Sequence, residues 1–182
     1  MSGLLTRNRL IGLAIAGFLF VVDQLVKWYV DGPVGLVREG DSIELLPFFN
    51  LMRVHNDGIS LGMLQAHTME ARWLLIGATA LIAVVVLVWM MRERKFADIL
   101  GLSMILGGAL GNIVDRATLG YVLDYADLHI GEFRPFLVFN LADAAITIGV
   151  VIILVRALFF SDNKDSKDTA KDTDSDAVPA EN

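Results

Sequence analysis

The fold of this 182-residue chain is decided by residues 73–91, which read WLLIGATALIAVVVLVWMM. These 19 residues include no charged side chain, and they are followed directly by Arg92, Glu93, Arg94 and Lys95. The core of a bilayer requires about 20 apolar residues in a helix, so this stretch predicts a transmembrane helix. The composition agrees, because 55% of the residues are hydrophobic and only 20% are charged, and the mean hydropathy is +0.58. An ordinary soluble domain is less apolar.

Three further stretches meet the same criterion, at about residues 10–30, 97–114 and 136–158. The chain is therefore predicted to be an all-α membrane protein with four transmembrane helices, built as one domain over residues 1–160. The first stretch could instead be a secretory signal peptide. It continues into Asp23 without a small-residue cleavage site, which favours a retained helix.

Basic residues predict the orientation of these helices. Three of the four residues in the short connection at 92–95 are basic, which places this connection and both termini in the cytoplasm. The longer connections, at about 31–69 and 115–135, then lie on the outer side. The first contains short apolar runs, Ser42-Ile-Glu-Leu-Leu and Phe48-Phe-Asn-Leu-Met-Arg-Val, which suit strands. We expect a small β-containing outer subdomain within 31–69.

The charge is concentrated in residues 161–182. They hold seven of the 21 acidic residues and three of the 15 basic ones, so they contribute −4 of the net charge of −6. This polar segment cannot bury enough surface to offset the entropy of ordering, so a disordered acidic cytoplasmic tail is expected. The remaining body is nearly neutral, which argues against nucleic acid as a partner.

Residue types also limit the chemistry. The chain has no cysteine, which excludes structural disulfides, thiolate metal sites and a cysteine nucleophile. His55, His67 and His129 are scattered without the spacing of metal ligands. We therefore expect neither a metal nor an organic cofactor.

An ionisable side chain inside a membrane span costs about 2.5–3.5 kcal/mol on insertion scales, so each needs a partner, an aqueous cavity or a chemical task. Asp23 and Lys27 are four residues apart and can pair on one helix face, as a structural ion pair. Asn112, Asp115 and Arg116 share one face of the third span. Solvation by interfacial water is an alternative for Asp115. The glycines one turn earlier are typical of close helix packing alone.

A third polar group stands near the start of the fourth span, where Asn140 and Asp143 face the same way. Asn140 alone could be a helix N-cap, with Asp143 in the first turn where the helix dipole favours a carboxylate. Asp124, considered alone, reads as a loop residue. His55-Asn-Asp-Gly58 is a turn signal.

Carboxylates from separate segments that meet in a semi-dry pocket can share one proton. The ionised member then draws a proton from water while the protonated member polarises a scissile carbonyl, as in aspartic proteases. Helical spacing alone favours Asp115 as the partner of Asp143.

Five motifs, taken in order, make the chain similar to the lipoprotein signal peptidase family, signal peptidase II of bacteria. They are Asp23-Gln-Leu-Val-Lys27, Asn56-Asp-Gly58, Gly107-Gly-Ala-Leu-Gly-Asn-Ile-Val-Asp-Arg116, Val122-Leu-Asp124 and Phe139-Asn-Leu-Ala-Asp143. The match covers roughly residues 10–158. It implies an intramembrane aspartic endopeptidase of the bacterial inner membrane, with its active site near the outer face. Such an enzyme removes signal peptides from diacylglyceryl-modified prolipoproteins by cleaving N-terminal to the lipidated cysteine.

The resemblance also implies roles for individual residues. The catalytic pair of the family falls on Asp124 and Asp143. The residues that would support this pair or contact substrate are Asn56, Gly58, Asn112, Asp115, Arg116, Asn140 and Ala142, braced by Asp23 and Lys27. A carboxylate beside Arg116 is more naturally ionised and paired, which suits a structural role for Asp115 and leaves Asp124 to share the proton.

Two departures from the family pattern are visible. After Gly58 this chain reads Ile59-Ser-Leu-Gly-Met-Leu, where the family has small residues and an aromatic one. Tyr125 replaces a common phenylalanine after the expected catalytic aspartate. The changes bear on the substrate loop and leave the aspartic pair in place.

The resemblance further implies prolipoprotein substrates and binding of cyclic peptide inhibitors that resemble the substrate. We also expect contact with membrane lipid and action as a monomer. The alternative from another class is a small proton-coupled membrane transporter, since intramembrane Asp, Asn and Arg also form proton relays. Four helices without repeats are few for transport, and the polar groups cluster at one membrane face. A structural assembly protein is a third reading, and it predicts that Asp124→Asn and Asp143→Asn each leave function intact.

Overall fold

The structure, a computed structural model, describes residues 6–59, 64–65 and 69–159; the expected acidic tail and the departure at 60–63 lie outside these residues. Within them run four long helices, α1 (Arg7–Asp31), α2 (Met69–Arg92), α3 (Phe96–Thr118) and α4 (Leu141–Phe159). Each is long and apolar enough to cross a membrane, so the predicted four-helix membrane architecture is confirmed.

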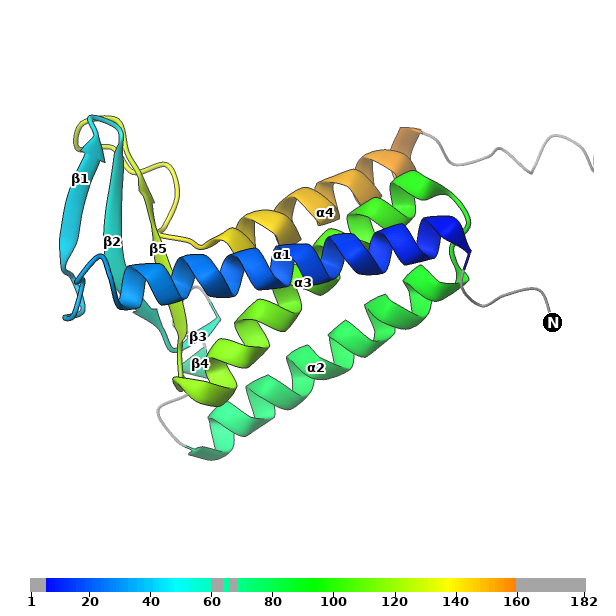
Figure 1. Cartoon of the computed structure of the whole chain (residues 1–182), viewed down its shortest axis with the longest axis horizontal. Coiled ribbons are helices and arrows are strands. Elements are labelled where there is room, and N and C mark those ends of the chain that lie inside the picture. Colours follow the sequence, from blue (N-terminus) through cyan, green and yellow to red (C-terminus); the bar gives the residue numbers. More distant parts are fainter. Residues whose placement is uncertain (1–5, 60–63, 66–68, 160–182) are drawn as a thin grey trace, which may run out of the picture.

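Helix α3 is the centre of the bundle. It contacts α1, α2 and α4, and Figure 1 shows it crossing the bundle beside all three. Half of its apolar stretch is buried, against 17–22% for the other three helices. The other helices therefore leave most of their apolar surface facing outward, as a lipid-embedded bundle requires.

Glycines on α3 permit this central position. A Cβ added at Gly107 would lie 2.6 Å from the backbone oxygen of Ala16 on α1, and one added at Gly108 would lie 2.4 Å from that of Ala142 on α4. Only hydrogen fits at such distances, so the helix backbones meet directly. The interpretation of these glycines as packing residues is confirmed.

A small sheet covers one end of the bundle. Its antiparallel strands β1 (Ser42–Leu46), β2 (Phe49–Asn56) and β5 (Val122–Leu128) lie in the order β1-β2-β5. Two very short strands, β3 (Gly58–Ile59) and β4 (Leu64–Gln65), pair separately. In Figure 1 the sheet lies at the end of the helices opposite to the start of α1 and the α2–α3 connection. We call this the sheet end of the bundle.

The first two strands confirm the expected β-containing segment, but the expectation for Asp124 is wrong. Asp124 lies in strand β5, where it is only 2% exposed, and not in a loop. The second connection thus contributes a strand to the sheet because Val122–Leu128 pairs with β2.

The fourth helix begins at Leu141 and not near residue 136 as expected. The preceding chain is extended, because the Phe139 N–H donates to the Ala126 oxygen at 3.1 Å and the Ala126 N–H donates to the Phe139 oxygen at 2.7 Å. This pairing with β5 delays the helix until the backbone leaves the sheet. The third helix, in contrast, continues past its expected end at 114 to Thr118.

Candidate active site

Three buried charges connect α1 and α3 at the sheet end. The Lys27 Nζ lies 2.7 Å from Asp23 Oδ2 and 2.8 Å from Asp115 Oδ2, with all three side chains at most 5% exposed. The expected Asp23–Lys27 pair is therefore present, and Asp115 joins it. The burial of Asp115 and its ion pair with Lys27 argue against interfacial water as the main stabilisation of this carboxylate. Its expected pairing with Arg116 is wrong as well, because Lys27 occupies that role.

This triad of Asp23, Lys27 and Asp115 also anchors the two segments that lead into the predicted catalytic pair. Asp23 Oδ1 accepts a hydrogen bond from the Ala142 N–H at 3.0 Å, in the first turn of α4. Asp115 Oδ2 accepts one from the Leu123 N–H at 3.2 Å, in β5. Each bond fixes the residue directly before a predicted catalytic aspartate. Ala142, which is 1% exposed, thus contributes its backbone to the brace.

Gln24 was not singled out in the sequence, although it lies inside the first motif. Its Nε2 donates to Asp115 Oδ1 at 2.9 Å. Tyr125, a departure from the family pattern, also contacts the site although it is not among the predicted site residues. Its Oη accepts a hydrogen bond from the Leu141 N–H at 3.1 Å, at the start of α4. The hydroxyl that distinguishes this chain therefore satisfies a free donor of the helix terminus.

The start of α4 is a capping box formed by Asn140 and Asp143. Asn140 Oδ1 accepts a hydrogen bond from the Asp143 N–H at 2.9 Å, and Asp143 Oδ2 accepts one from the Asn140 N–H at 3.4 Å. Such reciprocal bonds satisfy two donors of the first turn. The N-cap interpretation of Asn140 is confirmed. Asn140 also does more, because its Nδ2 donates to Asp124 Oδ1 at 2.6 Å.

Two more asparagines direct amide donors at the same carboxylates. Asn56 Nδ2 donates to Asp124 Oδ2 at 3.0 Å, and Asn112 Nδ2 donates to Asp143 Oδ1 at 2.8 Å. The two predicted catalytic carboxylates are therefore brought into one hydrogen-bonded network with all three asparagines that the resemblance indicated.

Each of these amides is held in one orientation through its oxygen. Asn56 Oδ1 accepts a hydrogen bond from the Gly58 N–H at 3.2 Å. Asn112 Oδ1 accepts bonds at 3.4 Å from the Lys27 Nζ and the Asn140 Nδ2. Because a carboxamide has one acceptor side and one donor side, an occupied oxygen leaves its NH₂ group to face the carboxylate. Gly58 and Lys27 thus act on the carboxylates through asparagines.

The electrostatics of Asp124 differ from those of an ordinary aspartate. Burial, followed by repulsion from the Asp143 carboxylate, raises the pKa of Asp124 to about 7, although the amides of Asn56 and Asn140 act in the opposite direction. Asp124 therefore keeps its proton to a much higher pH than an ordinary aspartate does. A carboxylic acid and a carboxylate in one network are the chemical requirement for general acid–base catalysis.

Arg116 lies one turn after Asn112 on α3, beside this network. Its Nη1 donates to the Asn112 backbone oxygen at 3.4 Å, and among the described residues its buried Nε has no hydrogen-bond partner. Its positive charge acts on Asp143, Asp124 and Asp115. Arg116 therefore adds favourable charge to the site, and within the described part of the chain it forms no close ion pair.

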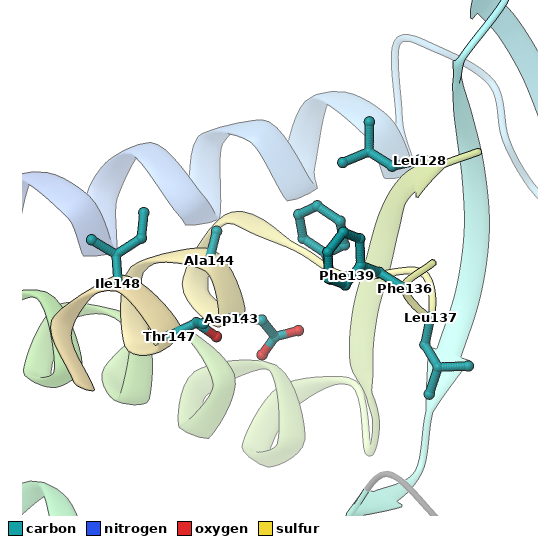
Figure 2. A pocket seen from close by; sticks show the side chains of 8 residues that line it. All are labelled: Leu128, Phe136, Leu137, Phe139, Asp143, Ala144, Thr147 and Ile148. Atoms are coloured by element: carbon teal, nitrogen blue, oxygen red, sulfur yellow. The ribbon is translucent and has the colours of Figure 1, made fainter. Parts of the chain in front are cut away.

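An apolar cavity of about 330 Å³ opens beside Asp143. Figure 2 shows the Asp143 carboxylate projecting from the first turn of α4 toward β5, with aromatic side chains next to it. The lining residues come from the end of β5, the segment before α4 and the first turns of α4: Leu128, Phe136, Leu137, Phe139, Asp143, Ala144, Thr147 and Ile148. Asp143 is the ionisable member of this lining, so a ligand in the cavity would meet one carboxylate in apolar surroundings.

The described residues contain no group of three or more His, Cys, Asp or Glu side chains that could hold a metal ion. The geometry thus unites two carboxylates from different elements, three oriented amides and an apolar cavity. It permits acid–base attack of water on a carbonyl group held beside Asp143.

Comparison with known proteins agrees with this chemistry. The sequence profile of a family described as Signal peptidase (SPase) II matches residues 15–159. A lipoprotein signal peptidase from Sphingopyxis alaskensis is 48% identical over 163 residues, covering 90% of this chain and 94% of that protein. Another from Rhizorhabdus wittichii is 47% identical over 175 residues, covering 96% and 94%.

A solved structure agrees as well. A bacterial membrane enzyme determined at 2.3 Å resolution superimposes with a TM-score of 0.73 at 29% identity, covering 86% of this chain and 93% of that one. These matches give the transporter alternative no support. The chain is a multi-pass membrane protein that belongs to the signal peptidase II family of peptidases.

Proposed function

We propose that this protein removes the signal peptides of diacylglyceryl-modified prolipoproteins, as an aspartic endopeptidase that cleaves N-terminal to the lipidated cysteine. The name of its relatives, lipoprotein signal peptidase, supports the substrate class. The observation that carries the chemistry is the network in which Asn140 donates to Asp124 while its own amide oxygen caps the N–H of Asp143.

In this proposal Asp124 and Asp143 are the catalytic residues. Asp124, with its pKa of about 7, donates its proton to the oxygen of the scissile carbonyl. Asp143, which borders the cavity, accepts a proton from the attacking water. The water oxygen bonds to the carbonyl carbon and forms a tetrahedral intermediate. As the C–N bond breaks, the leaving nitrogen takes the proton from Asp143. The carbonyl group re-forms, and the hydroxyl group that Asp124 had protonated returns its proton to Asp124.

The surrounding residues keep this pair ready for the reaction. Asn56, Asn112 and Asn140 hold the carboxylate oxygens by their amide groups, which leaves other lone pairs for water and substrate. The positive charge of Arg116 favours the ionised carboxylate. Such preorganised groups need no rearrangement during the reaction, which is the usual source of electrostatic catalysis.

The apolar cavity beside Asp143 suits a substrate that is itself apolar near the scissile bond. A signal peptide and an acylated cysteine both meet this description. Because the cavity lies at the start of α4, a substrate in the membrane would reach it at the level where the helices leave the bilayer. Proteolysis and lipid anchoring would then occur at the same depth.

We infer that the sheet end faces outward from the bacterial inner membrane and that both termini are cytoplasmic. The support is the basic connection at 92–95 at the opposite end of the bundle, where the positive-inside rule expects cytoplasm. Action as a monomer and inhibition by cyclic peptides that resemble the substrate belong to the same proposal.

The test is incubation of the purified protein with a diacylglyceryl-modified precursor, followed by a gel shift and mass spectrometry of both products. We expect a mature fragment that begins with the lipidated cysteine. The matched control is the same precursor with serine at the lipidation position, which should remain uncut. Cleavage of both precursors at equal rates, or at another bond, would contradict the proposed substrate class.

A further inference from the structure

A second cluster of side chains lies on the other face of the β2–β5 ribbon. Successive side chains of a strand point to opposite faces, and the register pairs Val54 with Asp124 and His55 with Leu123. Asn56 and Asp124 therefore share the face that holds the catalytic network. Arg53 and His55 lie on the opposite face, away from the carboxylates.

Arg53 is the centre of this cluster and is only 7% exposed. Its Nη1 donates to the Leu36 oxygen at 3.0 Å and pairs with the carboxylate of Asp31, the last residue of α1. Its Nη2 donates to Tyr121 Oη at 2.9 Å, and its Nε donates to His55 Nε2 at 3.1 Å. One guanidinium thus joins the end of α1, the following loop, β2 and the residue before β5.

His55 and Tyr121 add a direct contact between β2 and the residue that precedes β5. Their rings are stacked, with centroids 3.8 Å apart and an interplanar angle of 22°. Because His55 Nε2 accepts the hydrogen bond from Arg53, the ring proton lies on Nδ1, which is 3.7 Å from Glu39 Oε2. Each of the three side chains therefore has a defined orientation.

We propose that Arg53, His55 and Tyr121 form a clamp that positions Asn56 against Asp124 for catalysis, so that the three are positioning residues of the active site. The clamp rests on the proposed function, in which Asp124 is catalytic. The clamp lies at the end of the β2–β5 ladder, whose last pair is Asn56–Val122. His55 directly precedes Asn56, and Tyr121 directly precedes Val122. The clamp thus joins Tyr121, just outside this last pair, to His55 and Arg53 inside β2.

The consequence for the site follows from one hydrogen bond. Asn56 Nδ2 lies 3.0 Å from Asp124 Oδ2, and a separation of the strands by about 1 Å would break this bond. Asp124 would then bind its proton more tightly, since the Asn56 amide stabilises the carboxylate. The other charges that act on Asp124 come from Asp143 on α4, Lys27 on α1 and Arg116 on α3. Substitution of Tyr121 alters none of these three charged side chains.

The test is Tyr121→Phe, which removes the acceptor of Arg53 Nη2 and keeps the stacked ring. The matched control is Tyr29→Phe, which removes the hydroxyl of a 56% exposed tyrosine on α1. For Tyr121→Phe we expect kcat to fall about tenfold, because one charge-assisted hydrogen bond is lost. KM should stay within about twofold of the wild-type value. We also expect the alkaline limb of the pH–rate profile to move to higher pH. The control should keep both wild-type values.

A second pair of variants separates positioning from stability. Arg53→Lys retains a cation and should recover part of the kcat that Arg53→Met loses. If folded Tyr121→Phe cleaves like Tyr29→Phe with the same alkaline limb, or if only KM or only the melting temperature changes, the clamp has no catalytic role. Failure of the wild-type protein to cleave the lipidated precursor would instead overturn the proposed function, and the clamp with it.

Discussion

Gly108→Ala is predicted to separate α3 from α4 and thereby to slow catalysis. The added Cβ would lie 2.4 Å from the backbone oxygen of Ala142 and 2.8 Å from Ile146 Cγ1, whereas ordinary contacts begin at 3.4 Å. The obstacle is backbone and cannot rotate away. Helix α4 must therefore move away from α3 by about 1 Å, the difference between the ordinary contact distance and the 2.4 Å that the Cβ would have.

The magnitude of the effect follows from what lies next to this contact. Asn112 is one turn beyond Gly108, Asp143 follows Ala142, and the two side chains are joined by the 2.8 Å bond from Nδ2 to Oδ1. A retreat of that size lengthens this bond to roughly 3.8 Å, beyond hydrogen-bond distance. We expect kcat to fall about 100-fold, a loss that a misplacement of about 1 Å can cause. Overpacking should lower the free energy of unfolding by about 1–3 kcal/mol.

The assay is cleavage of a lipidated precursor in detergent, with thermal unfolding measured on the same preparations. Gly77→Ala is the matched control, because a Cβ at that helical position on α2 would meet nothing within 4 Å. This control should cleave at the wild-type rate and be no less stable, since alanine is the better helix former. Wild-type cleavage by Gly108→Ala would refute the argument that direct backbone contact sets the geometry of the site.

Three further predictions concern pH, charge and metal. Because the pKa of Asp124 is raised to about 7, its acid form persists to neutral pH and is lost at higher pH. The cleavage rate should therefore follow a bell-shaped profile and decline above about pH 7. A flat rate from about pH 4 to 9 would contradict this prediction. Lys27→Met leaves Asp23 and Asp115 buried without their cation, and it should lower the free energy of unfolding by about 3–5 kcal/mol. In denaturant titrations Arg38→Met, at an exposed position, should show no such loss. EDTA should leave the cleavage rate unchanged, and inhibition reversed by a divalent metal would require a different mechanism.

Several parts of this structure could be predicted from local sequence alone. The four helices depend on the length of apolar runs, such as residues 73–91, and this signal needs no knowledge of contacts. The pairing of Asp23 with Lys27 follows from helical spacing. The capping role of Asn140 follows from its place before a helix, with Asp143 three residues later.

The parts that were missed depend on contacts between distant segments. Strand β5 contains two aspartates and forms because it pairs with β2, which lies about 70 residues earlier in the chain. The late start of α4 has the same origin, since Phe139 pairs with β5. Asp115 has Arg116 beside it in sequence, yet Lys27 on another helix is its partner. Local spacing includes none of these contacts.

The assignment of the aspartic pair illustrates the same limit of spacing. Periodicity favoured Asp115 beside Asp143, whereas the family motifs favoured Asp124. The hydrogen bonds agree with the second choice, because Asp115 is engaged by Lys27 and Gln24 while Asp124 shares Asn140 with Asp143. The catalytic roles of Asp124 and Asp143 remain a proposal that rests on this geometry.

The most direct test of that proposal is the single-turnover rate of cleavage of a lipidated precursor by Asp143→Asn. This change keeps the shape of the side chain and removes its capacity to accept a proton from water. The account predicts a rate lower by about 100- to 10,000-fold, the contribution of a general base, while Glu70→Gln, at an exposed position on α2, keeps the wild-type rate. Undiminished cleavage by folded Asp143→Asn would contradict the aspartic mechanism.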